Sequence, residues 1–477
     1  MRCDVGQVIS IDILPDYVLL AIFDFCADED QSKKGIEAWQ SLVHVCQRWR
    51  GVVFGSPRRL NLRLVATNRT PVRDTLDTWP PVPLVIQDNA RLTDSESVDN
   101  IVTVLERRDR VDTIRLLDVD GPPLEKVLAA MQEPFSELTH LLLVSHDETV
   151  PVVSDSFLGR SAPRLRFLGL DHIPFPGLPK LLLSAAHLSL LFLWNIPHSG
   201  YISPEAMVTA LSTLISLEFL RLGFQSPLSH PDQENRSPAP QTRFVLPVLK
   251  VLLFKGVCEY LEDLVARIDA PQINHLGITF FNAIVFDTLQ FVQFISRTPT
   301  LRAFETARVA FLDSSARVYV SSRTPGSRFL KVAISCRKLY WQVLALEQVC
   351  TSCSPPLSTS TLEDLYIFRA SHSYPDWQDN VESMLWPELL RPFTAVKNLY
   401  LCKEFAPRIA PALEELIEGR TTTILPNLQN IFLEGLQPSG DSGLVQEGIG
   451  KFVAARQLSG HPTTVSLWER DPERDWN

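Results

Sequence analysis

Apolar residues recur every three or four positions, the spacing of one helix face, in two stretches of the first sixty residues. The first stretch spans 14–26, and its Pro15 suits a first helical turn because that position needs no N–H donor. The second spans 36–54 and ends at the Gly-Ser-Pro of 55–57. Segments of this length bury only a thin core, so we expect apolar side chains to remain partly exposed and to invite a partner.

Further along, a mostly apolar triple at positions p, p+3 and p+5 recurs twelve times, at intervals of 23 to 34 residues. The twelve triples begin at Val111, Leu138, Leu165, Leu188, Leu217, Leu249, Ile273, Leu301, Phe329, Leu362, Val396 and Leu428. A random start would match such a triple about once in eleven, so context must support the pattern. In five repeats a proline stands two residues before the first position of the triple, and this shared position supports the pattern. The prolines are Pro163, Pro247, Pro271, Pro299 and Pro426.

This period predicts a solenoid. The triples face a core shared by neighbouring repeats, and the residues between them lie on the concave side of a stacked parallel sheet. Helices form the outer layer, at 124–131, 205–214, 261–268 and 413–419, and the polar insertion 226–243 reads as an exposed loop. A doubly wound α/β domain would not repeat eleven times.

Composition narrows the class of protein. The 477 residues are 45% hydrophobic with a net charge of −10, which argues against disorder and against nucleic acid as a partner. Eight cysteines are too few for a disulfide scaffold, and no basic segment precedes an apolar one at the start, so we expect a cytoplasmic and/or nuclear protein. The most apolar stretch, 181–196, is shorter than the roughly 20 residues of a bilayer span, so no membrane partner is expected.

Catalytic motifs are missing from the sequence: it has no GxSxG, no HExxH and no GxGxxG after a strand. The segment 443–452 resembles a phosphate loop but has Ile449 where lysine should stand. Cys350 and Cys353 form a lone CxxC in a predicted polar loop, without partners at zinc spacing. We therefore expect no catalytic residue, no cofactor and no metal.

The first sixty residues resemble the F-box, in which Leu-Pro opens one helix with an Ile-Phe pair and a second helix carries Leu-Val, Cys and Trp. The matching residues are Leu14-Pro15, Ile22-Phe23, Leu42-Val43, Cys46 and Trp49. Residues 60–88 look like the continuation found in a large group of fungal F-box proteins. The connection at 27–35 is longer and more acidic than usual, and the repeats resemble irregular leucine-rich repeats without the usual asparagine.

The resemblance implies an α/β fold, with a small all-helical F-box at 1–60, a linker or first irregular repeats at 61–110, and a leucine-rich-repeat solenoid of parallel strands and outer helices at 111–477. It also implies a substrate-receptor subunit of an SCF-type E3 ubiquitin ligase. The F-box would bind a Skp1-like adaptor and, through it, a cullin; the ubiquitin-transferring cysteine would belong to other subunits, so this chain would not be an enzyme. The adaptor face or its support would be Leu14, Pro15, Leu19, Ile22, Phe23, Leu42, Val43, Cys46 and Trp49.

The protein substrate is unknown, and the concave side of the solenoid is its predicted site, because exposed aromatic and arginine side chains dominate interface energetics. The candidates there are Phe192, Trp194, Arg221, Lys255, Glu305, Tyr366, Tyr400 and Phe432. A competing interpretation buries Phe192 and Trp194. A block at 48–73, with seven arginines and no acidic residue, either steers an acidic partner or forms a solvated face.

Two other classes of protein stay open. One is a repeat scaffold or ligand-sensing interaction module outside ubiquitination, with the N-terminal helices serving only as a cap of the solenoid; binding of Skp1 separates it from the ligase subunit. The other is a hydrolase or transferase with an unrecognised site, which labelling by nucleophile-directed probes would reveal.

Overall fold

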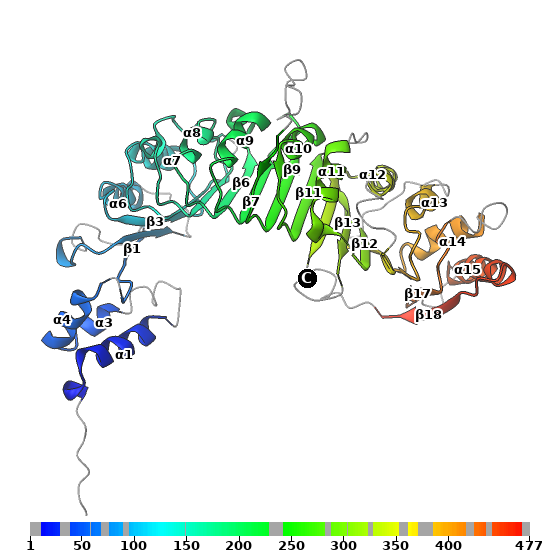
Figure 1. Cartoon of the computed structure of the whole chain (residues 1–477), viewed down its shortest axis with the longest axis horizontal. Helices are drawn as coiled ribbons and strands as arrows, with labels where there is room; N and C mark the ends of the chain where they lie inside the picture. The colour runs from blue at the N-terminus through cyan, green and yellow to red at the C-terminus, as the bar shows by residue number, and fades with distance from the viewer. Residues whose placement is uncertain are drawn as a thin grey trace, which may run out of the picture. The chain divides into compact units, whose positions relative to one another are not determined.

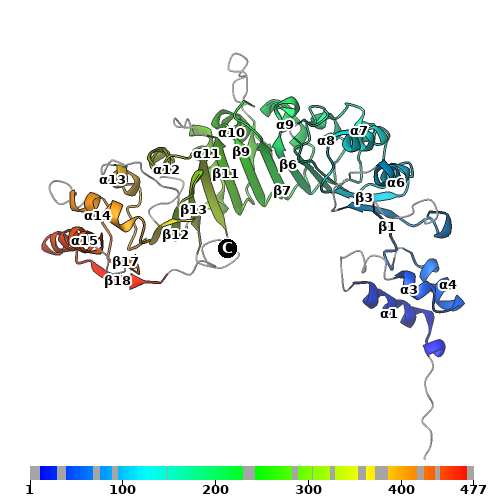
Figure 2. The same ribbon diagram turned by 180° about the vertical axis from the view of Figure 1, so that it is seen from behind.

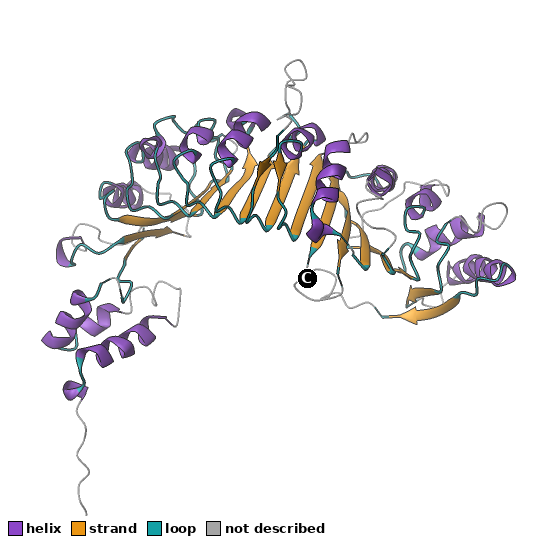
Figure 3. Cartoon of the chain, viewed as in Figure 1, coloured by secondary structure: helices purple, strands orange, loops and turns teal. Residues whose placement is uncertain are grey.

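The computed structural model describes residues 11–28, 39–57, 59–67, 76–88, 95–147, 149–228, 242–281, 288–302, 304–322, 328–352, 361–370, 385–415, 424–435 and 441–469 (Figure 1). The chain divides into two compact units, residues 1–188 and residues 189–477. In each unit strands alternate with helices, and the helices of the repeats lie on one side of the strands (Figure 2 and Figure 3).

The first unit opens with a cluster of short helices: η1 Ile11–Ile13, α1 Asp16–Asp28, α3 Trp39–Val43 and α4 Gln47–Gly55. α1 agrees with the helix predicted over 14–26. The cluster packs around Leu19, Phe23, Val43 and Val53, none of which exposes more than 1% of its surface.

The second predicted helix, over 36–54, is wrong as a single element, because the chain turns at residues 44–45. Cys46 becomes the N-cap of α4, and its Sγ accepts a hydrogen bond from the Trp49 N–H at 3.4 Å. Arg50 Nε donates to the Val43 carbonyl at the end of α3, at 3.1 Å. Apolar residues at helical spacing occur on both sides of this break, so spacing alone does not reveal the turn.

Five strands follow in the first unit, and each pairs in parallel with the next. They are β1 Leu64–Ala66, β2 Leu84–Asp88, β3 Val111–Leu116, β4 His140–Val144 and β5 Phe167–Asp171, with α6 Ser95–Leu105, α7 Gly121–Ala130, η2 Phe157–Arg160 and α8 Leu178–Leu182 along the same stretch. The sheet therefore starts at β1, within the segment 61–110 that was predicted as linker or first repeats.

The second unit has the sheet order β6-β7-β9-β11-β14-β13-β12-β15-β16-β17-β18. The strands are β6 Leu190–Ile196, β7 Phe219–Phe224, β9 Val251–Gly256, β11 His275–Phe281, β12 Thr306–Phe311, β13 Ser315–Ser321, β14 Phe329–Ser335, β15 Asp364–Arg369, β16 Asn398–Leu401, β17 Asn430–Glu434 and β18 Thr464–Trp468; β8 Phe244–Val245 and β10 Ile268–Asp269 form a separate pair. The helices are η3 His198–Gly200, α9 Pro204–Leu211, α10 Cys258–Val265, α11 Leu289–Arg297, η5 Pro299–Leu301, α12 Leu339–Ser352, α13 Leu385–Leu390, α14 Ala406–Glu415 and α15 Asp441–Leu458.

Three strands of the second unit depart from the predicted all-parallel order. β14 pairs in parallel with β11 and β12 pairs in parallel with β15, but β13 lies between β14 and β12 and is antiparallel to both. From β11 the chain passes two strand positions before it forms β12. β13 and then β14 fill these two positions, each antiparallel to the strand before it. β13 carries the alternation of a strand, with Ala316, Val318 and Val320 buried, but the apolar triples do not include it.

The insertion shifts the register of two predicted triples. Ala307 of β12 pairs with Leu365 of β15, so the first position of this repeat is Phe304 and not Leu301. In β14, Leu330 pairs with Leu276, which moves the pattern by two residues and leaves Phe329 on the opposite side of the strand. A shift of two preserves the alternation of side chains, so apolar content could not detect it.

The other ten triples form the core as predicted, with no side chain more than 4% exposed. Four helical predictions overlap helices of the outer layer but extend beyond their ends: 124–131 overlaps α7, 205–214 α9, 261–268 α10 and 413–419 α14. Ile268, at the end of the third segment, belongs to β10. Cys350 is buried in α12 and not in a loop, whereas Cys353 and most of the insertion 226–243 lie outside the described residues.

Candidate interaction surfaces

The residues predicted for adaptor binding divide into core and surface. Leu19, Phe23 and Val43 are buried between the N-terminal helices, so they support the fold of this cluster. The half-buried members are Leu14, Leu42, Cys46 and Trp49, and the exposed ones are Pro15 and Ile22. The sequence could not separate these roles, because α1 is apolar on more than one side.

Four exposed apolar residues near this surface were missed. Ile13, Tyr17 and Phe25 are 68%, 69% and 70% exposed, and Val45, after α3, is 59% exposed. Tyr17 and Phe25 are eight residues apart on α1, so they lie on the same side of the helix. Apolar side chains exposed together mark an interaction surface in a folded protein. We call Ile13, Tyr17, Ile22 and Phe25, which lie on α1 or directly before it, the α1 surface.

The entry of α1 is fixed by Arg48 of α4. Its Nη2 donates to the Leu14 carbonyl and lies 2.7 Å from Asp16 Oδ1. The Trp49 ring packs against the Phe23 ring with centroids 4.7 Å apart. The Leu-Pro opening is thereby held in one position against α4.

Trp39 joins the helices to the first strands. Its Nε1 donates to the Arg63 carbonyl at 2.8 Å, and its ring makes an edge contact with Trp79, with centroids 5.1 Å apart. The side chain is 2% exposed. The helical cluster therefore has its own contacts with the start of the sheet.

Three arginines of the block at 48–73 act within the chain. Arg48 contacts Asp16, Arg50 donates to the Val43 carbonyl, and Arg63 lies 3.1 Å from Asp112 Oδ2. Arg58, Arg69 and Arg73 lie outside the described residues. The block is thus partly structural.

In the second unit, the predicted residues of β6, β7 and β9 come together on one side of the sheet. Phe192 pairs with Arg221, and the Arg221 guanidinium lies 4.7 Å from the Phe192 ring and 3.7 Å from the Trp194 ring. Lys255 Nζ lies 5.4 Å from the Trp194 ring. Phe192 and Trp194 are half-buried, so the interpretation that simply buries both does not hold.

Gly223 leaves space for Trp194. A Cβ at this position would lie 2.3 Å from Trp194 Cε3, and no real Cβ approaches another atom so closely. Glycine at this position of β7 therefore allows the indole to lie across the strand and under Arg221.

A ring ladder covers the same side of β15, β16 and β17. Tyr366 stacks on Tyr400 with centroids 4.1 Å apart, and Tyr400 stacks on Phe432 at 4.5 Å, each pair 9° from parallel. Trp468 of β18 packs edge-on against Tyr400 at 5.4 Å. Burial is the main cause that raises the pKa of Tyr366, and the neighbouring Tyr400 adds to it. The Tyr366 phenol is therefore neutral over the physiological range.

Glu305 does not take its predicted place, because of the register shift at β12. Arg308 takes the place on the sheet that was predicted for Glu305. It pairs with Tyr319 and Tyr366, and its guanidinium carbon lies 5.8 Å and 5.7 Å from the centres of their rings. Glu305 precedes β12.

Three further members of this side were missed: Arg317 and Tyr319 on β13 and Lys331 on β14. The alternation of polar and apolar residues in 315–321 was the signal that could have found the two on β13. Burial lowers the pKa of Lys331, and the charge of Arg317 lowers it further. We call this side of β6, β7, β9, β11, β14, β13, β12 and β15 to β18 the strand face.

Among the described residues, one group of side chains has the composition of a metal site: Cys402, Glu404 and Glu434, whose ligand atoms lie within 4.8 Å of one another. Burial, and then the charge of Glu404, raises the pKa of the Cys402 thiol to about 12. The thiol is therefore protonated near neutral pH.

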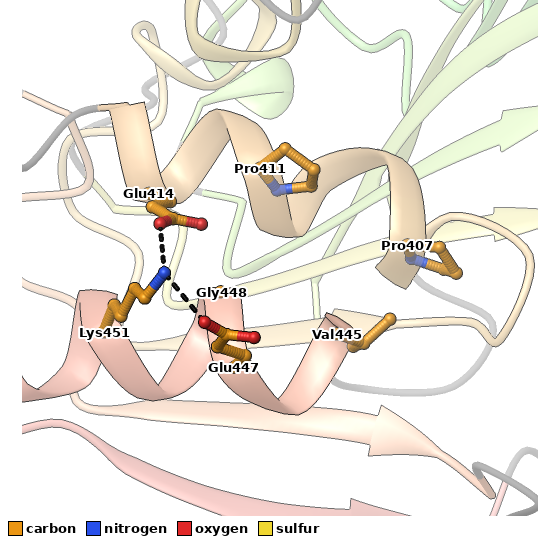
Figure 4. Close-up of a pocket in the computed structure, with 7 residues that line it drawn as sticks. All are labelled: Pro407, Pro411, Glu414, Val445, Glu447, Gly448 and Lys451. Carbon is orange, nitrogen blue, oxygen red and sulfur yellow. Dashed lines mark hydrogen bonds and ion pairs between the residues drawn. The ribbon is translucent and has the colours of Figure 1, made fainter. Parts of the chain in front are cut away.

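A cavity of about 280 Å³ lies between α14 and α15 (Figure 4). Its lining residues are Pro407, Pro411, Glu414, Val445, Glu447, Gly448 and Lys451. Lys451 Nζ lies 2.8 Å from Glu414 and 3.0 Å from Glu447, and these hydrogen bonds raise the pKa of the lysine. The charged groups that line the cavity therefore pair with one another, which indicates a structural contact between α14 and α15.

The repeated strands and outer helices make this a mixed α/β repeat protein, consistent with a leucine-rich-repeat-like solenoid. In the part of the chain that the structure describes, no helix is long and apolar enough to cross a bilayer.

Comparison with known proteins gives a similar structure but no family. No protein-family model and no curated protein matches the sequence. Eleven chains of solved structures match. One is the leucine-rich repeat-containing protein LegL7 from Legionella pneumophila, with 12% identity and a TM-score of 0.27, covering 68% of this chain and 94% of that one.

Proposed function

We propose that this chain is the substrate-receptor subunit of an SCF-type E3 ubiquitin ligase, in which the N-terminal helices bind a Skp1-like adaptor, and through it a cullin, and the strand face holds a target protein. The observation that carries the proposal is the α1 surface. Its members stay exposed although the same helices bury Leu19, Phe23 and Val43 in a core. Together with the F-box resemblance, this supports docking of an adaptor at that surface.

In this role the chain performs no covalent chemistry. It holds a lysine of the target near a charged conjugating enzyme and so raises the effective concentration of the two reactants. The N-terminal helices provide one attachment point and the strand face the other. The Arg48 contacts with Leu14 and Asp16 support the first by keeping the start of α1 in a fixed position before the adaptor binds.

Binding to purified Skp1, measured by pull-down and calorimetry, tests the proposal. Phe25→Asp places a charge in the α1 surface and should weaken binding by about 30-fold, the equivalent of a hot-spot loss of about 2 kcal/mol. The matched control is Leu458→Asp on α15, which puts the same charge on a leucine that is 91% exposed. It should bind Skp1 like the parent. A folded parent chain that does not bind Skp1 would refute the ligase role.

A second candidate function is a repeat scaffold outside ubiquitination. The Trp39 contacts with Arg63 and Trp79 favour it, because they are what a cap of the first strands requires. On this view the parent does not bind Skp1, and Trp39→Ala loosens β1, which hydrogen exchange of residues 64–66 would detect.

A further inference from the structure

We propose that the strand face from β6 to β12 binds an extended acidic peptide segment of the target, with its carboxylates at Arg221, Lys255, Lys331, Arg317 and Arg308. This inference names the ligand class of the target site and therefore rests on the proposed function. It goes beyond that function because a target-binding face alone implies no particular chemistry of the target.

The first support is the distribution of charge. The seven strands β6, β7, β9, β11, β14, β13 and β12 contain five basic residues and no Asp or Glu, in a chain whose net charge is −10. On the next strand, Asp364 marks the limit of this region, and its Oδ1 accepts a hydrogen bond from Asn398. A surface of one sign within a chain of the other attracts a partner of opposite charge.

The second support is strand register, which places all five cations on one side. Arg221 pairs with Leu253, Leu253 with Gly277, and Gly277 with Lys331. The same row continues from Lys331 through Tyr319 to Arg308. Lys255 and Arg317 lie two residues along their strands from members of this row, and side chains two residues apart point to the same side.

The third support is how the cations are held. Arg221 and Lys255 lie over the Trp194 ring, and Arg308 lies between the rings of Tyr319 and Tyr366. A ring attracts a cation through its quadrupole, and Lys255 Nζ also donates to Asn195 Oδ1 at 3.2 Å, so these contacts hold the cationic groups in defined positions on the strand face. Burial and the charge of Arg317 both disfavour the charged form of Lys331, and the opposite charge of a carboxylate placed nearby would favour it.

The distance across the strands from β7 to β12 sets the length of peptide that can contact all five cations. Arg221 on β7 and Arg308 on β12 are separated by five strand steps, or about 24 Å at roughly 4.8 Å per step. An extended peptide advances about 3.3 Å per residue, so about seven residues cross the region. Alternate acidic side chains of such a segment would all point toward the sheet.

Ring geometry favours a peptide over a single-stranded nucleic acid. Nucleic acid bases bind by stacking on exposed ring faces. Here Tyr366, Tyr400 and Phe432 stack on one another, and the Trp194 face is taken by Arg221 at 3.7 Å. The rings therefore position cations and each other.

Fluorescence anisotropy with the full chain tests the inference. The probe is a fluorescein-labelled ten-residue peptide of alternating Glu and Gly, with a Lys and Gly peptide and a ten-nucleotide oligothymidylate as comparison ligands. The acidic peptide should bind, and binding should weaken as salt rises. Arg308→Glu and Lys331→Glu should each weaken it about tenfold. Lys338→Glu, the same charge change in the exposed turn after β14, is the matched control and should have little effect.

Several outcomes would overturn the inference: no binding of the acidic peptide, equal binding by Arg308→Glu and the parent, or tighter binding of the oligonucleotide through the same residues. Arg308→Gln and Lys331→Gln remove charge without reversing it, and circular dichroism of each variant verifies the fold. Skp1 binding is measured on the same preparations. Its persistence without peptide binding refutes the acidic ligand alone, and peptide binding without Skp1 refutes the ligase role alone.

Discussion

A ladder of polar side chains should set the register on which the ring ladder depends. Asn398 Nδ2 donates to Asp364 Oδ1 at 2.7 Å, and Asn398 Oδ1 accepts from Asn430 Nδ2 at 2.8 Å. Thr464 Oγ1 continues the ladder by donating to Asn430 Oδ1 at 2.7 Å. Asp364, Asn398 and Asn430 precede Tyr366, Tyr400 and Phe432 by two positions on the same side of β15, β16 and β17.

Asn398→Ala removes two of these bonds. The bond to the carboxylate of Asp364, which is only 8% exposed, contributes about 1.5 to 3 kcal/mol, and the bond to Asn430 about 0.5 to 1.5 kcal/mol. Because Asn398 is half-buried, water partly replaces these bonds, and the expected net loss is about 2 kcal/mol. The matched control Thr464→Val removes one neutral bond at an exposed end and should cost less than about 1 kcal/mol.

Urea unfolding followed by far-UV circular dichroism measures these free energies, and near-UV dichroism reports the stacking of the rings. Asn398→Ala should shift the midpoint and also reduce the near-UV signal of the native protein. The reasoning fails if Asn398→Ala costs no more than Thr464→Val, or if the near-UV signal is unchanged while stability falls.

Three further predictions concern single residues. Gly223→Ala forces its Cβ against Trp194, so it should lower the free energy of unfolding by about 1 to 3 kcal/mol and weaken acidic-peptide binding, as urea unfolding and anisotropy would show; equal stability would contradict the contact. Burial lowers the pKa of His275, so the unfolded chain takes up a proton first and stability should fall as the pH drops below about 6.5. His275→Gln should lose part of that dependence in unfolding experiments between pH 7 and 5, and an unchanged slope would count against it. With its pKa at about 12, the Cys402 thiol should be alkylated on the order of a thousandfold more slowly in the native protein than in urea at pH 8.5, as mass spectrometry would measure, and rapid native labelling would contradict its protonated state.

Local pattern predicted much of the solenoid. Ten of twelve triples fall in the core, because a residue that must face the layer beneath its strand is apolar in nearly every repeat. The same pattern failed at β12 and β14, where the partner strand is decided by hydrogen bonds between distant segments. Glu305 was predicted in place of Arg308 for this reason.

The candidate surfaces divide in the same way. The apolar residues of α1 were visible in the sequence, but only packing against Trp49 decided that Phe23 is core, whereas Phe25 lies exposed. Likewise, the sequence identified some of the arginines and aromatic residues of the strand face, but it did not predict that the arginine side chains lie against the rings.

The sequence by itself determined the repeating alternation of strands and helices and the identity of most core positions, because these depend on the local period of apolar residues. Tertiary structure decided strand order, the antiparallel insertion of β13, and which cations share a row, such as Lys331 and Arg308. The reason is physical: strand pairing joins residues far apart in the chain, and the apolar pattern of a strand shows which side is buried without naming the partner strand.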